Sequence, residues 1–307
     1  MRAKEALSTQ ITPMWKIHTN TITLLASITV LFATSTHANS PVWEIKKGDN
    51  TVFIGGTIHL LSEQDYPLPS TFESAYKKSD SIVFETDISQ ASALATQAKM
   101  LPVIMTQDGT TLESRLDKAT FTRLTAYLEE RNLPIAMFQA LTPAGINLTL
   151  LALELQKLGV NSESGVESYF NSLAVKDNKP ITWLESIDEQ IAVLAAMNQI
   201  DPNLTINTTL DDMHKLPTEW AKLLGIWRKG DMPALKELGI DTMIDASPEL
   251  YDALVVKRNN NWAPKIMNML DTPDTEFVLV GALHLAGKDS VLKLIDTKTV
   301  TIRQLNQ

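Results

Sequence analysis

The chain has 307 residues and a formal net charge of −9, and hydrophobic residues make up 44% of it. This is enough apolar material for a buried core, and so acidic a chain is repelled by nucleic-acid phosphates and by anionic membranes. We therefore expect no nucleic-acid partner. The sequence contains no cysteine, which excludes disulfides, thiolate catalysis and cysteine–zinc sites.

The start of the chain has the three parts of a secretory signal peptide. Basic residues precede an uncharged apolar run at 21–35, and small residues lead to a cleavage position after Ala38. An uncleaved anchor is the alternative, but the run is shorter than the ~20 residues that a bilayer span needs. The sequence predicts a signal peptide at 1–38 and a domain at 39–307 that is periplasmic or secreted and free of the membrane after cleavage.

Short apolar runs and helical patterns alternate along the rest of the chain. Residues 42–45 and 51–54 are expected to form a hairpin around the turn at 47–50, and 81–84 has the pattern of a buried strand. Further helices are expected at about 72–78, 112–128, 143–158, 187–198, 210–229, 233–238, 250–270 and 290–295, and further strands at 180–184, 276–280 and 299–303. This order predicts an α/β protein: a mixed β-sheet flanked by helices, with a large central helical region.

Two histidines occur in the same local sequence. Residues 52–60 align without gaps to residues 277–285, and each copy is an apolar strand that runs into Gly-x-x-His-Leu. Functional groups collect beyond the carboxyl ends of strands in α/β sheets, and neutral imidazole is the commonest transition-metal ligand. A lone histidine at a strand end is usually structural, but the duplicated context favours a shared site. We predict that His59 and His284 are metal ligands.

Several acidic side chains and one arginine can complete such a site. Glu85 and Glu185 end expected strands, and Glu167 lies in Gly-Val-Glu-Ser; each can also be a helix-start or surface carboxylate. Arg258 can stabilise developing negative charge or hold a substrate carboxylate, or can simply face solvent on a helix. We predict Glu85 and Glu167 as metal ligands, and Glu85, Glu185 and Arg258 as catalytic residues. Histidine and carboxylate ligands without thiolate suit zinc, manganese or cobalt.

Motifs for other chemistries are absent. The sequence has no Gly-x-Ser-x-Gly elbow, no His-Glu-x-x-His helix, no P-loop and no Gly-x-Gly-x-x-Gly turn. This disfavours serine-hydrolase, zincin and nucleotide-dependent activities. His214 stands between Met213 and Lys215 in a charged helical stretch, and we expect it to be exposed.

Five segments together resemble a known family. They are 56–61 (Gly-Thr-Ile-His-Leu-Leu), 84–87 (Phe-Glu-Thr-Asp), 165–167 (Gly-Val-Glu) followed by 183–185 (Trp-Leu-Glu) and Gln190, 258–262 with its Arg, Asn and Trp, and 281–287 (Gly-Ala-Leu-His-Leu-Ala-Gly). In order and spacing, over roughly residues 42–305, they resemble the TraB/GumN family, which is related to the Tiki metalloproteases.

The resemblance implies a fold similar to erythromycin-esterase and ChaN-like proteins, with the two Gly-x-x-His motifs facing each other. Because Tiki proteins are manganese- or cobalt-dependent proteases, it also implies an exported hydrolase, a peptidase in which metal-activated water attacks an amide of a peptide or small-molecule substrate. His59 and His284 would be ligands or catalytic groups, with Glu85 a ligand or base and Arg258 assisting. Two alternatives stay open: a peptide- or signal-binding protein without turnover, and a metal-free esterase-like hydrolase with one histidine as general base.

Overall fold

The computed structural model describes residues 39–90, 93–295 and 297–307, so the expected signal peptide lies outside the described residues. The strands are β1 (Asn39–Lys47), β2 (Asn50–Thr57), β3 (Ser81–Phe84), β4 (Ile181–Trp183), β5 (Glu276–Gly281) and β6 (Thr301–Asn306). The α-helices are α1 (Ser70–Lys78), α2 (Leu94–Ile104), α3 (Leu112–Arg115), α4 (Lys118–Glu129), α5 (Pro143–Lys157), α6 (Val166–Asp177), α7 (Ile187–Ala196), α8 (Pro202–Arg228), α9 (Met232–Leu235), α10 (Thr242–Ala246), α11 (Pro248–Tyr251), α12 (Lys257–Met269) and α13 (Val291–Leu294). Two π-helical segments, η5 (Lys236–Asp241) and η6 (Asp252–Val256), and the 3-10 turn η7 (Ala282–Leu285) complete the elements that matter below.

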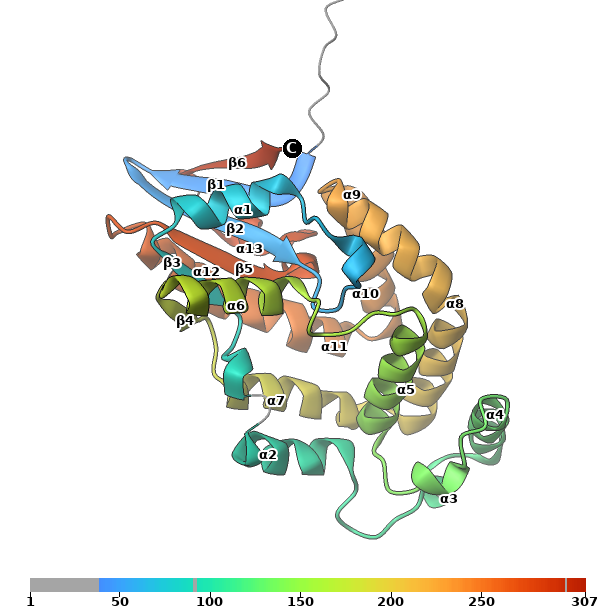
Figure 1. The fold of residues 1–307 in the computed structure, drawn as a ribbon. Helices are drawn as coiled ribbons and strands as arrows, with labels where there is room; N and C mark the ends of the chain where they lie inside the picture. The colour runs from blue at the N-terminus through green and yellow to red at the C-terminus, as the bar shows by residue number, and fades with distance from the viewer. Residues whose placement is uncertain (1–38, 91–92, 296) are drawn as a thin grey trace, which may run out of the picture. The chain divides into compact units, whose positions relative to one another are not determined.

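The strands form one mixed sheet in the order β4-β3-β5-β2-β1-β6 (Figure 1). Strands β4, β3, β5 and β2 run parallel to one another, whereas β1 pairs antiparallel with both β2 and β6. The predicted hairpin is therefore confirmed. Its turn is tight because Lys47 pairs with Asn50 and Gly48 adopts a φ of 60°, a conformation that glycine reaches without steric cost.

Helices cover both faces of the sheet, as the side chains of β5 show. Phe277 and Leu279 point into a core that contains Phe72 of α1 and Phe170 of α6. Their neighbours Val278 and Val280 belong to a second core, in which Trp262, Ile266 and Val291 of α12 and α13 pack. A strand that is buried on both faces has the continuous apolar sequence seen here, rather than an alternating one.

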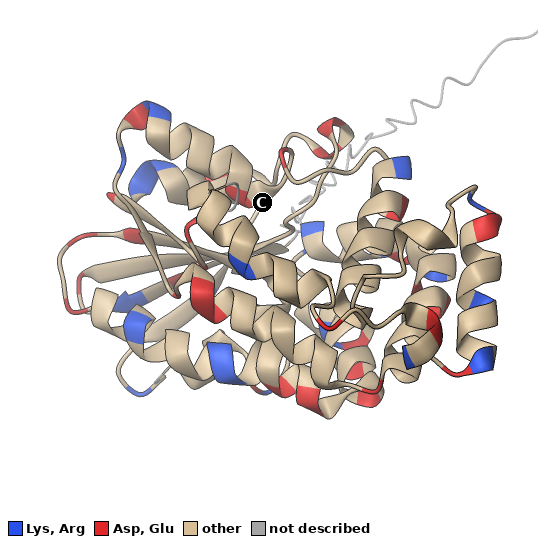
Figure 2. Ribbon diagram, turned by 90° about the horizontal axis from the view of Figure 1, so that it is seen from below, with Lys and Arg blue, Asp and Glu red and all other residues tan. Residues whose placement is uncertain are grey.

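A third core lies within the helical region between β3 and β5. It is built by apolar side chains of α3, α4, α5 and α8, among them Leu112, Leu124, Ile146 and Leu210. The mixed α/β architecture and its large central helical region are thus as predicted. None of the described helices is both long enough and apolar enough to cross a lipid bilayer. In the view of Figure 2, lysine and arginine positions are scattered among acidic ones and form no stripe.

The structure also contains elements that the sequence patterns do not predict. Helices α2 and α6 fall in stretches with no expected helix, and α8 starts at Pro202, eight residues before its expected beginning at about 210. The expected helix at 250–270 consists of α11, the π-helical segment η6 and α12. Such π-helical segments are rare and occur frequently near functional sites.

Candidate active site

The four parallel strands end at one edge of the sheet, and a predicted site residue follows each of them. These residues are Glu185 after β4, Glu85 after β3, His284 in the turn after β5, and His59 after β2. Carboxyl ends of parallel strands share an edge, which is where open α/β sheets place their ligands. Arg258 on α12 and Glu167 in the first turn of α6 reach the same edge.

His59 is paired with the buried carboxylate of Glu167. Nδ1 of His59 lies 2.8 Å from Oε1 of Glu167, and the hydroxyl of Thr57 donates a hydrogen bond to the same oxygen. The start of α6 packs directly on this segment, because a Cβ on Gly165 would lie 2.0 Å from the carbonyl oxygen of His59. A glycine at this position therefore lets Glu167 approach the imidazole from the helix that carries it.

Arg258 joins three predicted site residues through its guanidinium group. It donates to Glu185 from Nε (3.1 Å) and Nη2 (2.8 Å), and Nη2 also donates to Oε2 of Glu85 at 2.5 Å. Nη1 lies 3.1 Å from Nε2 of His284 and 3.3 Å from the carbonyl oxygen of Leu254. The guanidinium therefore directs its N–H groups at protein partners, and we assign it the role of holding Glu85, Glu185 and His284 in place.

His284 is buried and has partners on both ring nitrogens. Its Nδ1 lies 2.7 Å from Oδ1 of Asn259, whose Nδ2 donates to the carbonyl oxygens of His284 and Asp289. Because Nδ2 is the donor of this amide, Oδ1 accepts and Nδ1 carries the imidazole proton. Nε2 then accepts from Arg258. Burial lowers the pKa of His284 to about 4, so this imidazole is neutral at neutral pH.

Glycine at position 281 leaves space between the two histidines. Its N–H donates to Oε1 of Glu85 at 2.6 Å. A Cβ at this position would lie 3.2 Å from Nε2 of His59, 3.4 Å from Oε1 of Glu85 and 3.6 Å from Cδ2 of His284. The second imidazole nitrogen of His59 thus faces a small gap bordered by Glu85 and His284.

The charged groups of the site shift the pKa values of their neighbours. The carboxylate of Glu167 raises the pKa of His59 to about 9, although water reaching a side chain that is 60% exposed moderates this shift. Burial alone would raise the pKa of Glu85, but the positive charges of His284, Arg258 and His59 and the Gly281 N–H lower it to about 2. Since His284 is neutral at pH 7, Arg258 and the protonated His59 are the positive charges that keep Glu85 ionised there.

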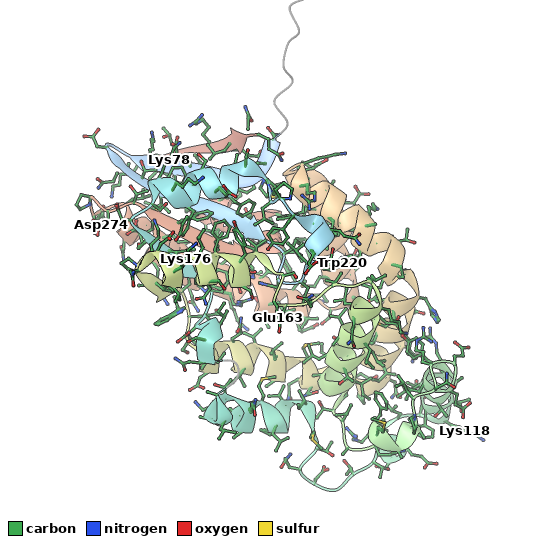
Figure 3. The ribbon with its side chains drawn as sticks, viewed as in Figure 1. Lys78, Lys118, Glu163, Lys176, Trp220 and Asp274 are labelled. Carbon is green, nitrogen blue, oxygen red and sulfur yellow. The ribbon has the colours of Figure 1, made fainter. Side chains whose placement is uncertain are left out.

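Two cavities of different character meet at His59. The first, about 300 Å³, is lined mainly by apolar side chains, which include Trp220, Leu223, Leu235, Met243, Leu254, Val255 and Leu283. The second, about 360 Å³, is lined by Phe84 and Ile88 together with the polar residues Glu85, Thr86, Ser162, Glu167, Ser168 and Gln190. Trp220, which is labelled in Figure 3, lies on α8 near the carboxyl ends of β2 and β5.

Not all of the predicted metal ligands have a ligand atom that is free to bind an ion in this arrangement. Nε2 of His284 and both oxygens of Glu85 accept hydrogen bonds, and the Arg258 cation stands between them. Oε2 of Glu167 and Nε2 of His59 have no hydrogen-bond partner among the described atoms that would compete with an ion. Within the described residues, no three His, Cys, Asp or Glu side chains gather as a metal site would require. Zinc, manganese or cobalt binding stays a prediction.

All six predicted site residues lie at one edge of the sheet, although their chemical roles stay predictions. The sequence patterns did not assign roles to Thr57, which orients Glu167, or to Asn259, which orients His284. Asn259 adjoins Arg258 in the sequence, and that adjacency on one helix was the available signal. His214 is exposed as expected, with its ring 5.7 Å from that of Tyr127.

Fold and site together define an α/β protein with a buried ionic cluster and an accessible histidine at the carboxyl edge of its parallel strands. The profile of the TraB/PrgY/gumN family matches residues 41–304, and the chain belongs to this family. It is 27% identical to Uncharacterized protein YbaP of Escherichia coli (strain K12) over 261 residues, 84% of this chain and 93% of that protein. It is likewise 27% identical to YbaP of Shigella flexneri over 241 residues, 78% and 86% of the two chains. No solved structure matches the chain.

Proposed function

We propose that the protein is a hydrolase in which His59, oriented by Glu167, activates a water molecule. The observation that carries this proposal is the difference between the two histidines. His284 uses both ring nitrogens within the protein, whereas Nδ1 of His59 contacts Glu167 and Nε2 faces the gap beside Gly281. An imidazole held by a carboxylate on one nitrogen, with the other nitrogen free toward the reacting group, is the arrangement that general-base catalysis requires.

The proposed reaction is a simple hydrolysis. Water in the gap attacks the carbonyl carbon of the substrate and gives its proton to Nε2 of the neutral form of His59. Because Glu167 raises the pKa of His59 to about 9, this form is the minor one at neutral pH and increases as the pH rises. The C–N bond of an amide, or the C–O bond of an ester, then breaks, and His59 returns the proton to the leaving group. Glu167 stabilises the imidazolium ion that forms in between, and Thr57 keeps that carboxylate in position.

The buried cluster supports this reaction by fixing positions and charge. Glu185 accepts two hydrogen bonds from Arg258 and one from Nε1 of Trp262 at 3.1 Å. Glu85 accepts from the guanidinium and from the Gly281 N–H, so the carboxylate that borders the gap stays ionised and immobile. We assign Arg258 and Glu185 positioning roles, because both are engaged with protein partners.

The class of substrate and the setting are part of the proposal. We propose a peptide substrate and export of the mature domain, in line with the family resemblance and with the signal-like sequence at 1–38. We also propose that the fold is similar to that of erythromycin-esterase and ChaN-like proteins, because the paired Gly-x-x-His segments end adjacent parallel strands. A divalent metal, where bound, would supply an activated water. Because His284 and Glu85 already accept hydrogen bonds from protein groups, binding of the metal by all four predicted ligands together is disfavoured.

A turnover screen tests the proposal. The domain 39–307 is incubated with a peptide library and with chromogenic esters, with and without chelator, and its metal content is measured. The proposal predicts hydrolysis that survives chelation and that falls at least about 10³-fold in His59→Ala, consistent with the usual contribution of a general base. The exposed His214→Ala is the matched control and keeps full activity.

The alternatives appear as other outcomes of the same screen. Chelator-sensitive hydrolysis with tightly bound metal would overturn the metal-free reaction and favour a metal-dependent peptidase. Peptide binding without any product would overturn hydrolysis and favour a binding protein. Full activity of His59→Ala would overturn the assignment of the base.

A further inference from the structure

The cavities on the two sides of His59 differ in a way that can select a substrate. His59 lines both of them, so a molecule whose reacting bond lies over its imidazole can extend into both cavities. The first cavity offers apolar walls, and the second also offers carboxylates and hydroxyls. Their contrast bears on which substrates the proposed hydrolase accepts.

Much of the wall of the apolar cavity comes from the helical segments α8, α10 and η6. Trp220 and Leu223 come from α8, Met243 from α10, and Leu254 and Val255 from η6. Its volume of about 300 Å³ lies at the lower end of the range for small-ligand pockets, which suits one large apolar side chain or a short acyl chain. The indole Nε1 of Trp220 is buried and has no hydrogen-bond partner among the described residues.

Two residues that line the second cavity each carry a buried oxygen atom without a partner. Glu167 and Thr86 are 6% and 5% exposed, and Oε2 of Glu167 and Oγ1 of Thr86 have no hydrogen-bond partner among the described residues. A buried polar atom without a partner costs free energy that a bound donor recovers. Glu85 and Glu167 line this cavity and are paired with Arg258 and His59, but the unpartnered acceptor is a carboxylate oxygen of Glu167, and such an oxygen favours a positively charged donor over a neutral one.

We propose that the substrate carries an apolar group for the first cavity and a protonated amine for the second, on opposite sides of the cleaved bond. This inference rests on the proposed hydrolysis for the position of that bond, but the two binding preferences are independent of turnover. The amine can come from a free amino terminus or from a lysine side chain. The apolar group can be the side chain of a residue such as leucine or phenylalanine.

Binding of simple alkyl compounds tests the polar cavity. n-Hexylamine and n-hexanol are titrated into the domain 39–307 by calorimetry at pH 7.5, and we expect the amine to bind at least tenfold more tightly. Thr86→Val removes the unpartnered hydroxyl at nearly constant shape and reduces amine binding at least fivefold without changing hexanol binding. The matched control is Thr71→Val, because Thr71 is also 5% exposed with an unpartnered Oγ1 but lies on α1, outside both cavities.

A second pair of variants tests the apolar cavity. Leu254→Trp fills part of its volume and weakens both hexyl compounds at least tenfold, whereas Leu204→Trp, on an exposed position of α8, leaves both unchanged. Leucine amide and an acetylated lysyl-leucine amide distinguish an amino terminus from a lysine side chain as the source of the amine. Whichever binds more tightly identifies the source.

The results separate this inference from the proposed function. Equal binding of amine and alcohol, or no effect of Thr86→Val, would overturn the inference even if hydrolysis is found. Stabilisation of the protein by Mn²⁺ or Zn²⁺ that Thr86→Val abolishes, without amine binding, would show a metal site instead. Selective amine binding without hydrolysis of any substrate would leave this inference standing and overturn the hydrolase.

Discussion

Gly281→Ala tests whether the gap between the histidines is the reaction site. The added methyl group would lie 3.2 Å from Nε2 of His59 and 3.4 Å from Oε1 of Glu85, so it would occupy the space proposed for water. The backbone of Gly281 has φ −51° and ψ 135°, which alanine adopts without strain. The free energy of unfolding should therefore change by less than about 1 kcal/mol.

Activity should respond much more strongly than stability. Displacing a reacting group by about 1 Å costs on the order of 100-fold in rate, so kcat/KM of Gly281→Ala should fall at least 100-fold. The assay pairs initial rates on the best substrate of the turnover screen with urea unfolding of the same preparation. Gly225→Ala, in α8 with nothing within 4 Å of the added Cβ, is the control; it keeps its activity and gains up to about 1 kcal/mol. Activity of Gly281→Ala within threefold of the parent would refute the reasoning.

Three further predictions concern stability and pH. Trp227→Phe removes the buried indole N–H that donates to the Gly56 carbonyl at 2.7 Å, so urea unfolding should show a loss of about 1–3 kcal/mol; an unchanged midpoint would contradict this. Burial raises the pKa of Glu276 to about 7, so the stability that its protonated form contributes is lost as pH rises from 4.5 through 7. The free energy of unfolding of Glu276→Gln should therefore exceed that of the parent by up to about 2 kcal/mol at pH 8 and equal it at pH 4. The same difference at both pH values would contradict this prediction. Because Glu167 raises the pKa of His59, kcat/KM should rise with pH above 6.5, and Glu167→Gln should move that rise to lower pH with a lower plateau.

The edge of the sheet that carries the site was largely predictable. The strand at 276–280 is an apolar run, and the hairpin at 42–54 has mainly apolar strands on either side of clear turn residues; both formed as expected. The duplicated Gly-x-x-His segment correctly placed two histidines after adjacent strands, because β2 and β5 pair in parallel with Thr57 beside Gly281. Local sequence therefore located the ends of the strands that carry the site.

The partners of these residues depend on packing that no local pattern reports. The N-cap residue of helix α6 is Gly165, which has no side chain to cap the helix, so the usual start signal is missing although this helix carries Glu167. Helix α2 contains Pro102, which disfavours a helix in any pattern-based prediction. The role of Arg258 depends on how α12 packs against the strand ends, and that packing involves residues far apart in the chain.

Chemical rescue tests the role of His59 most directly. The side chain of His59 is 60% exposed, so its removal in His59→Ala leaves a site that free imidazole can enter from solvent. The account predicts that imidazole restores hydrolysis by His59→Ala at least tenfold over the unrescued rate, with no such effect on the parent protein. An unimpaired His59→Ala, or an inactive one that imidazole fails to rescue while its fold is intact, would contradict a general base at this position.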